Sequence, residues 1–100
     1  MDDFITVDEL LSYMGYDVAD EMIMKNAERA IDFADSYLKG SIGDNYPKTD
    51  LRARELGLMI ASDVYENHGL VQTLSGNVRK LVHDVSWQLR LELQRGVFNE

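Results

Sequence analysis

The longest run of apolar residues at helical spacing in the chain extends from Leu51 to His68. On a helix with 3.6 residues per turn, these side chains form one broad apolar stripe and leave only a narrow polar strip for solvent. Such a helix must be contacted on more than one side, so we predict that it lies at the centre of the fold. The residues expected to pack against neighbouring elements are Gly57, Ile60, Ala61, Val64 and Tyr65.

Gly57 lies in the middle of this predicted helix, where glycine costs about 1 kcal/mol relative to alanine. The close approach of another backbone would explain a glycine at this position. The alternative is a glycine without a packing role, because isolated glycines do occur in helices.

Two helices are predicted before the central one. A short helix starts after Thr6, which fits a capping box, and ends near Gly15. Asp17 or Asp20 can cap a second helix, in which apolar residues recur at steps of three and four until Gly40.

The segment from Gly40 to Thr49 contains the only proline of the chain and two of its seven glycines. This composition predicts a loop without further structure, and we expect it to be the most mobile part of the chain. Thr49 or Asp50 then caps the central helix.

Near the end of the chain, apolar and polar residues alternate strictly from Val85 to Leu93. Alternation is typical of a strand with one buried face, although Leu, Gln, Arg and Glu favour helix. We predict the strand, and a lone strand needs a partner outside its own fold. The expected interface residues are Trp87, Leu89, Leu91 and Leu93. The alternative is a continued amphipathic helix that packs within the chain.

Together these patterns predict an all-α fold, a small bundle of three main helices around a central apolar helix with a C-terminal helical or extended segment. One hundred residues, 45% of them hydrophobic, suffice for a single domain covering residues 1–100. The absence of cysteine excludes disulfides and thiolate metal sites. Without a basic, apolar leader or a long uncharged apolar window, we expect neither export nor a membrane span.

The net charge of −8 is placed unevenly along the chain. Residues 1–50 contain 12 acidic and 4 basic side chains, whereas residues 51–100 contain 6 of each. Tight DNA binding relies on Lys and Arg to neutralise phosphates, so this balance argues against a DNA-binding module. An acidic wall can still face DNA without holding it. The alternative is that the charge simply keeps the protein soluble.

No constellation in the sequence indicates catalysis, a cofactor or a metal. His68 and His83 lack a second ligand at metal spacing, and His68 is expected to cap a helix end or border the core. The carboxylates Glu28, Asp32 and Asp35 share a helical row, but basic residues among them favour a solvated face. We therefore predict no catalytic, cofactor-binding or metal-binding residues, and a small enzyme is disfavoured.

The predicted central helix closes in Val-Tyr-Glu-Asn-His, residues 64–68. This ending resembles the signature helix of the small head-tail connector proteins of tailed bacteriophages, which typically closes in a Tyr-Glu-Asn-Arg-like sequence. His68 stands where the family has arginine. The resemblance continues in order through residues 5–10, 20–38 and 81–89, and so covers most of the chain.

The resemblance implies a structural virion protein rather than an enzyme. Copies would assemble into a ring that docks on the phage portal, contacts downstream tail or connector proteins and lets DNA pass without specific binding. Such a protein is made in the cytoplasm of the bacterial host, in an active phage or a prophage, and ends at the head-tail junction of the virion, with no membrane contact. The alternative is a small helical regulatory module that binds one host protein and has no virion role.

Overall fold

The computed structural model describes residues 4–17, 20–66 and 76–96, with side chains from residue 79 onwards in the last segment. It contains four helices: α1 (Val7–Met14), α2 (Glu21–Ser41), α3 (Leu51–Glu66) and α4 (Gly76–Gln94). No strand occurs among these residues. The prediction of an all-α bundle is confirmed.

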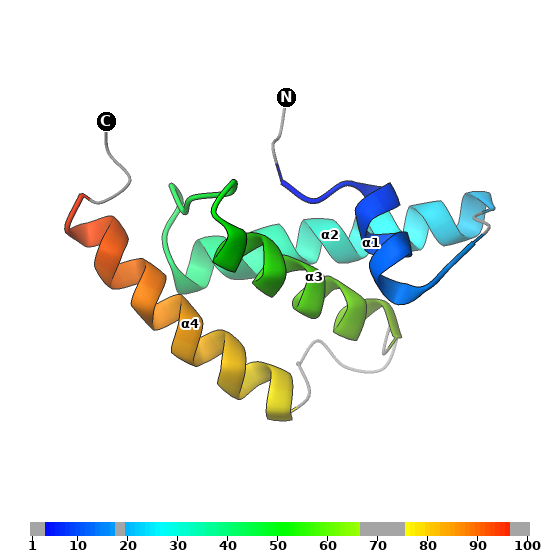
Figure 1. Ribbon diagram of the computed structural model, residues 1–100. Coiled ribbons are helices and arrows are strands. Elements are labelled where there is room, and N and C mark those ends of the chain that lie inside the picture. Colours follow the sequence, from blue (N-terminus) through cyan, green and yellow to red (C-terminus); the bar gives the residue numbers. More distant parts are fainter. Residues whose placement is uncertain (1–3, 18–19, 67–75, 97–100) are drawn as a thin grey trace.

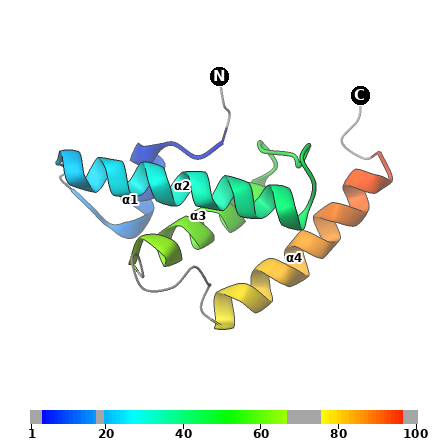
Figure 2. The ribbon, with the colours of Figure 1, turned by 180° about the vertical axis from the view of Figure 1, so that it is seen from behind.

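The two helices α2 and α3 pack along each other, with α1 against one end of the pair and α4 across the other (Figures 1 and 2). Both α2 and α3 contact every other helix, whereas no contact between α1 and α4 occurs in the ranges that the structure describes. Helix α3 is therefore contacted on several sides, as its broad apolar stripe requires.

Local signals in the sequence set the first two helix starts. Thr6 Oγ1 accepts a hydrogen bond from the Glu9 N–H at 3.1 Å, and Glu9 Oε1 accepts one from the Thr6 N–H at 2.9 Å. This is the predicted capping box. Gly15, with φ 85°, follows α1 in the left-handed conformation. Of the two predicted caps for α2, Asp20 is the one used, because its Oδ1 accepts from the Ile23 N–H at 2.8 Å.

The connection from α2 to α3 is a loop attached to α2. Helix α2 continues through Gly40 to Ser41, so the predicted helix end at Gly40 was wrong. The hydroxyl of Tyr46 donates a hydrogen bond to Asp35 on α2, and Tyr46 itself is buried. Lys48 Nζ lies 3.6 Å from Asp35 Oδ1. The loop prediction is confirmed, whereas its attachment through a buried tyrosine was not predicted.

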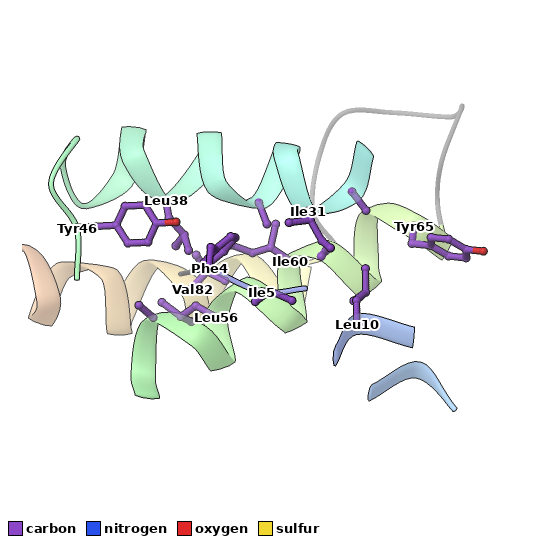
Figure 3. Close-up of a cluster of buried hydrophobic side chains, with 14 of the residues drawn as sticks. Phe4, Ile5, Leu10, Ile31, Leu38, Tyr46, Leu56, Ile60, Tyr65 and Val82 are labelled. Atoms are coloured by element: carbon purple, nitrogen blue, oxygen red, sulfur yellow. The ribbon is translucent and has the colours of Figure 1, made fainter. Parts of the chain in front are cut away.

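The hydrophobic core draws on all four helices and on the segment before α1 (Figure 3). Its helical part includes Leu10 and Leu11 of α1, Ala27, Ala30, Ile31, Ala34 and Leu38 of α2, Ala53, Leu56, Ile60, Ala61 and Tyr65 of α3, and Val82 and Leu89 of α4. Of the residues predicted to pack from the central helix, Gly57, Ile60, Ala61 and Tyr65 are buried, and Val64 is partly buried against the core.

Gly57 is contacted by side chains of the N-terminal segment. A Cβ atom at this position would lie 2.6 Å from Phe4 Cζ and 2.8 Å from Phe4 Cε1, and would also meet Ile5 Cδ1. Phe4 packs edge-to-face on Tyr46, with ring centroids 5.9 Å apart, so its ring is confined from the other side as well. The predicted close contact exists, but the neighbour is a pair of side chains and not the backbone of another helix.

The segment predicted as a strand is part of helix α4, so that prediction was wrong. The residues that face the core recur at helical spacing: Val82, Ser86 and Leu89 are buried, and Val85 and Leu93 pack against the core. A serine on the buried stripe and a tryptophan beside it on the exposed face produced the apparent alternation. Leu89 is 0% exposed within its own chain, so its assignment to an intersubunit interface was also wrong.

Replacing Gly57 with alanine should lower the melting temperature, because the new methyl group overlaps the Phe4 ring. We expect a loss of about 1 to 3 kcal/mol, as for other overpacked cores. Gly40→Ala is the matched control, since that helical glycine has nothing within 4 Å of an added Cβ. It should stabilise the protein by about 0.4 to 1 kcal/mol. Equal melting temperatures for the two variants would contradict the packing of Phe4 on α3.

Candidate interaction site

Two adjacent residues of α4 occupy environments that do not suit their chemistry. Ser86 is 3% exposed, and its hydroxyl has no hydrogen-bond partner among the described residues. Trp87, the only tryptophan of the chain, is 55% exposed although its side chain is large and mostly apolar. An unpaired buried hydroxyl costs roughly 1 to 3 kcal/mol. Residues that break the local rules of folding in this way are expected where a protein makes functional contacts.

Ser86 and Trp87 both lie in a cleft of about 410 Å³ between α4 and the C-terminal half of α2, which we call the basic cleft. It is lined by Tyr37 and Ser41 of α2 and by Arg79, Val82, His83, Ser86, Trp87 and Arg90 of α4. Among the described residues, no carboxylate contributes to this lining. In a chain with a net charge of −8, the basic cleft is therefore a local region of positive charge.

The two arginines stand at different levels of the basic cleft. Arg79 and Arg90 are eleven residues apart on one helix, which corresponds to about 16 Å along its axis. His83 lies between them and is exposed, with its Nδ1 3.5 Å from Asp84 Oδ1. The spacing gives the basic cleft two separated cationic groups with Ser86 and Trp87 between them.

The other flank of α4 borders a second depression, of about 260 Å³, which we call the apolar groove. It is lined by Leu51, Arg52, Glu55, Leu56 and Met59 of α3 and by Leu81 and Val85 of α4. Leu51 is 72% exposed and Leu81 46%. Helix α4 thus lies between a cationic surface and an apolar one.

Arg52 fixes the C-terminal part of α4 against the start of α3. Its Nη1 and Nη2 donate to the two carboxylate oxygens of Glu92 at 2.8 and 2.7 Å. Its Nε and Nη2 also donate to Asp50, at 3.1 and 3.2 Å. Hydrogen bonding to Arg52 lowers the pKa of Glu92 and the pKa of Asp50, and these carboxylates raise the pKa of Arg52. The bidentate geometry orients α4 more strictly than a single ion pair would.

A surface of opposite character lies where the chain passes from α1 to α2. We call it the acidic end and define it by six exposed residues: Tyr13, Tyr16, Asp17, Asp20, Glu21 and Met22. No Lys or Arg occurs between Tyr13 and Glu21. Tyr16 packs edge-to-face on Tyr65 with ring centroids 5.7 Å apart, and burial raises the pKa of Tyr65.

Of the four residues predicted to form an interface, only Trp87 lines the basic cleft. Leu91 is partly exposed, and Leu93 is packed against the core. Arg79, Ser86 and Arg90 were missed. Ser86 and Arg90 follow Arg79 by seven and eleven positions, a spacing that places all three on one face of a helix. The interpretation of the segment as a strand hid this shared face.

The residues weighed for chemistry in the sequence are not brought together where the structure describes them. His68 lies outside the described residues, and His83 is exposed. Asp35 is held by Tyr46, Lys39 and Lys48, whereas Glu28 and Asp32 are exposed. Within the described ranges, no group of three His, Cys, Asp or Glu side chains could hold a metal ion. Nor does any helix in those ranges have the length and apolar character needed to cross a membrane.

Comparison of the chain with protein-family models, with curated proteins and with solved structures finds no match. Function is therefore inferred from the sequence and geometry of this chain.

Trp87→Ala should leave the stability of the monomer nearly unchanged, because the side chain is more than half exposed. Leu89→Ala, two residues further on the same helix, should cost about 2 to 5 kcal/mol, since it empties a core position. The free energy of unfolding of each variant can be measured with urea, at a protein concentration where the chain is monomeric. A large loss for Trp87→Ala would show that Trp87 belongs to the core of the monomer.

Glu92→Gln should destabilise the protein in a pH-dependent way. Because Arg52 holds the folded pKa of Glu92 below its ordinary value of 4.5, the stabilisation is fully present above pH 4.5. It is lost as the pH falls through the lower folded pKa. The difference in melting temperature between wild type and Glu92→Gln should therefore shrink as the pH falls below 4.5. Glu28→Gln, at an exposed position of α2, is the control and should show little difference at any pH. A Glu92→Gln difference that is independent of pH would contradict the ion pair.

Proposed function

We propose that this chain is a structural subunit of a ring-shaped head-tail connector of a tailed bacteriophage, which docks on the portal and lines a passage for DNA. The observation that carries the proposal is the pair of unlike exposed surfaces on the two flanks of α4. One flank presents the apolar groove with Leu51 and Leu81, and the other presents Trp87. Contacts between unlike surfaces repeat from copy to copy and close into a ring where the rotation between copies permits.

The resemblance of the sequence to the connector family supports this proposal from a second direction. It extends over the start of α1, most of α2, the end of α3 and the middle of α4, in that order along the chain. The proposal includes no reaction and no cofactor.

The charge of the chain suits a passage for DNA. Exposed carboxylates on α1 and α2 and a net charge of −8 leave few cations to neutralise phosphates. A wall of this kind lets a duplex pass without holding it.

One alternative has an observation in its favour. The apolar groove is large enough to accept a few apolar side chains of a single partner protein, as in a small regulatory module. Such a module would have no need to associate with itself, and its mass would not depend on concentration.

The molecular mass measured by sedimentation across a concentration series separates the two functions. A connector subunit should shift from the monomer to one larger species of defined mass. Trp87→Asp should hold the protein in the monomeric state, because it places a charge on the exposed flank of α4, while its melting temperature stays close to that of wild type. Gln88→Asp, which adds the same charge at the neighbouring exposed position, is the control and should assemble as wild type does. A wild-type protein that stays monomeric at every concentration, alone and with a portal protein, would contradict the connector function.

A further inference from the structure

The basic cleft and the acidic end lie in different parts of the molecule. The basic cleft is lined by α4 and the C-terminal half of α2. The acidic end includes the start of α2, which lies next to α1 and far from α4 (Figures 1 and 2). The molecule measures 42 Å in its longest dimension, and α1 does not contact α4 in the part of the chain that the structure describes. The two surfaces cannot meet within one chain, but they can meet between two chains.

The basic cleft contains donors that the chain itself does not satisfy. Arg79 and Arg90 are both exposed, and neither forms an ion pair with a described residue. The hydroxyl of Ser86 also has no hydrogen-bond partner among these residues, but its own chain covers it, so the donors open to a partner are the two guanidinium groups. A carboxylate suits these two groups, since it forms strong charged hydrogen bonds with a guanidinium group.

The length of the basic cleft favours a protein surface over a small anion. The backbone positions of Arg79 and Arg90 lie about 16 Å apart along the axis of α4, so a surface with several carboxylates matches the two arginines better than one small anion does. The acidic end supplies several carboxylates close together, at Asp17, Asp20 and Glu21. Its exposed Tyr16 and Met22 are apolar surfaces of the kind that would cover the indole of Trp87.

We propose that the acidic end of one copy of this chain docks in the basic cleft of the next copy. The contact joins unlike surfaces, so each copy keeps one acidic end and one basic cleft for its two neighbours. This inference rests on the proposed function, because it names the surfaces through which the subunits of the ring meet.

Charge reversal tests the inference on the full chain. The variant Arg79→Glu with Arg90→Glu reverses the basic cleft, and Asp17→Lys with Glu21→Lys reverses the acidic end. Asp20 is left in place because it caps α2. Arg29→Glu with Lys80→Glu changes the net charge by the same amount as the first variant, at exposed positions that do not line the basic cleft, and serves as its control. Helical content and melting temperature, measured on each variant, establish that it is folded.

Sedimentation should show that each reversed variant stays monomeric at concentrations where wild type and the control variant assemble. Mixing the two reversed variants in equal amounts should restore assembly. The unchanged acidic end of the first variant then meets the unchanged basic cleft of the second, and the reversed, basic end of the second meets the reversed, acidic cleft of the first. Folded variants that assemble normally on their own, or that fail to assemble when mixed, would overturn the inference and leave the ring itself intact. A wild-type protein that never assembles would overturn the proposed function and the inference with it.

A second variant separates docking from folding. Trp87→Ala removes an exposed indole from the basic cleft, so the melting temperature of the dilute protein should stay nearly the same. Its assembly should nevertheless require a severalfold higher concentration than that of wild type. An unchanged assembly midpoint would remove Trp87 from the contact and count against the proposal. Binding of duplex DNA that Arg79→Glu with Arg90→Glu abolishes, with self-assembly unchanged, would assign the basic cleft to phosphates and overturn the proposal.

Discussion

The contact of Phe4 and Ile5 with Gly57 is the constraint on which the rest of the fold depends. Both side chains lie where a Cβ atom of residue 57 would be, so the N-terminal segment packs closely on α3 only because that residue is glycine. Phe4 in turn packs on Tyr46, whose hydroxyl is bound by Asp35 of α2. Because residue 57 has no side chain, the N-terminal segment, α3 and the loop after α2 can pack together in a single core.

The sequence allowed the first three helices to be predicted because each has local signals. Thr6 and Asp20 are caps whose hydrogen bonds involve residues three positions away, and the stripe of α3 follows from its own periodicity. The partners of Gly57 could not be predicted, since Phe4 is 53 positions away and no periodicity links the two. The part of α4 from Val85 to Leu93 was interpreted as a strand because Ser86 occupies a core position and Trp87 an exposed one, which imitates the alternation of a strand.

The part of α4 that was predicted wrongly also forms part of the candidate interaction site. An exposed tryptophan contributes little to the stability of the monomer, so a partner that covers Trp87 would explain its presence. Arg52 makes such a use possible, because its paired hydrogen bonds to Glu92 hold α4 at a defined angle to α3. The basic cleft and the apolar groove are therefore preformed on the two flanks of α4 in the monomer. The acidic end, on the other side of the molecule, offers the complementary charge.

Fluorescence of Trp87 tests the central claim most directly, because it is the only tryptophan in the chain and lies in the basic cleft. In dilute protein its emission should be that of a solvent-exposed indole and should be quenched readily by iodide. As the concentration rises and the mass increases, the emission should shift to shorter wavelength and quenching should diminish in parallel. An emission spectrum that stays the same while the protein assembles would contradict the placement of the subunit contact at Trp87.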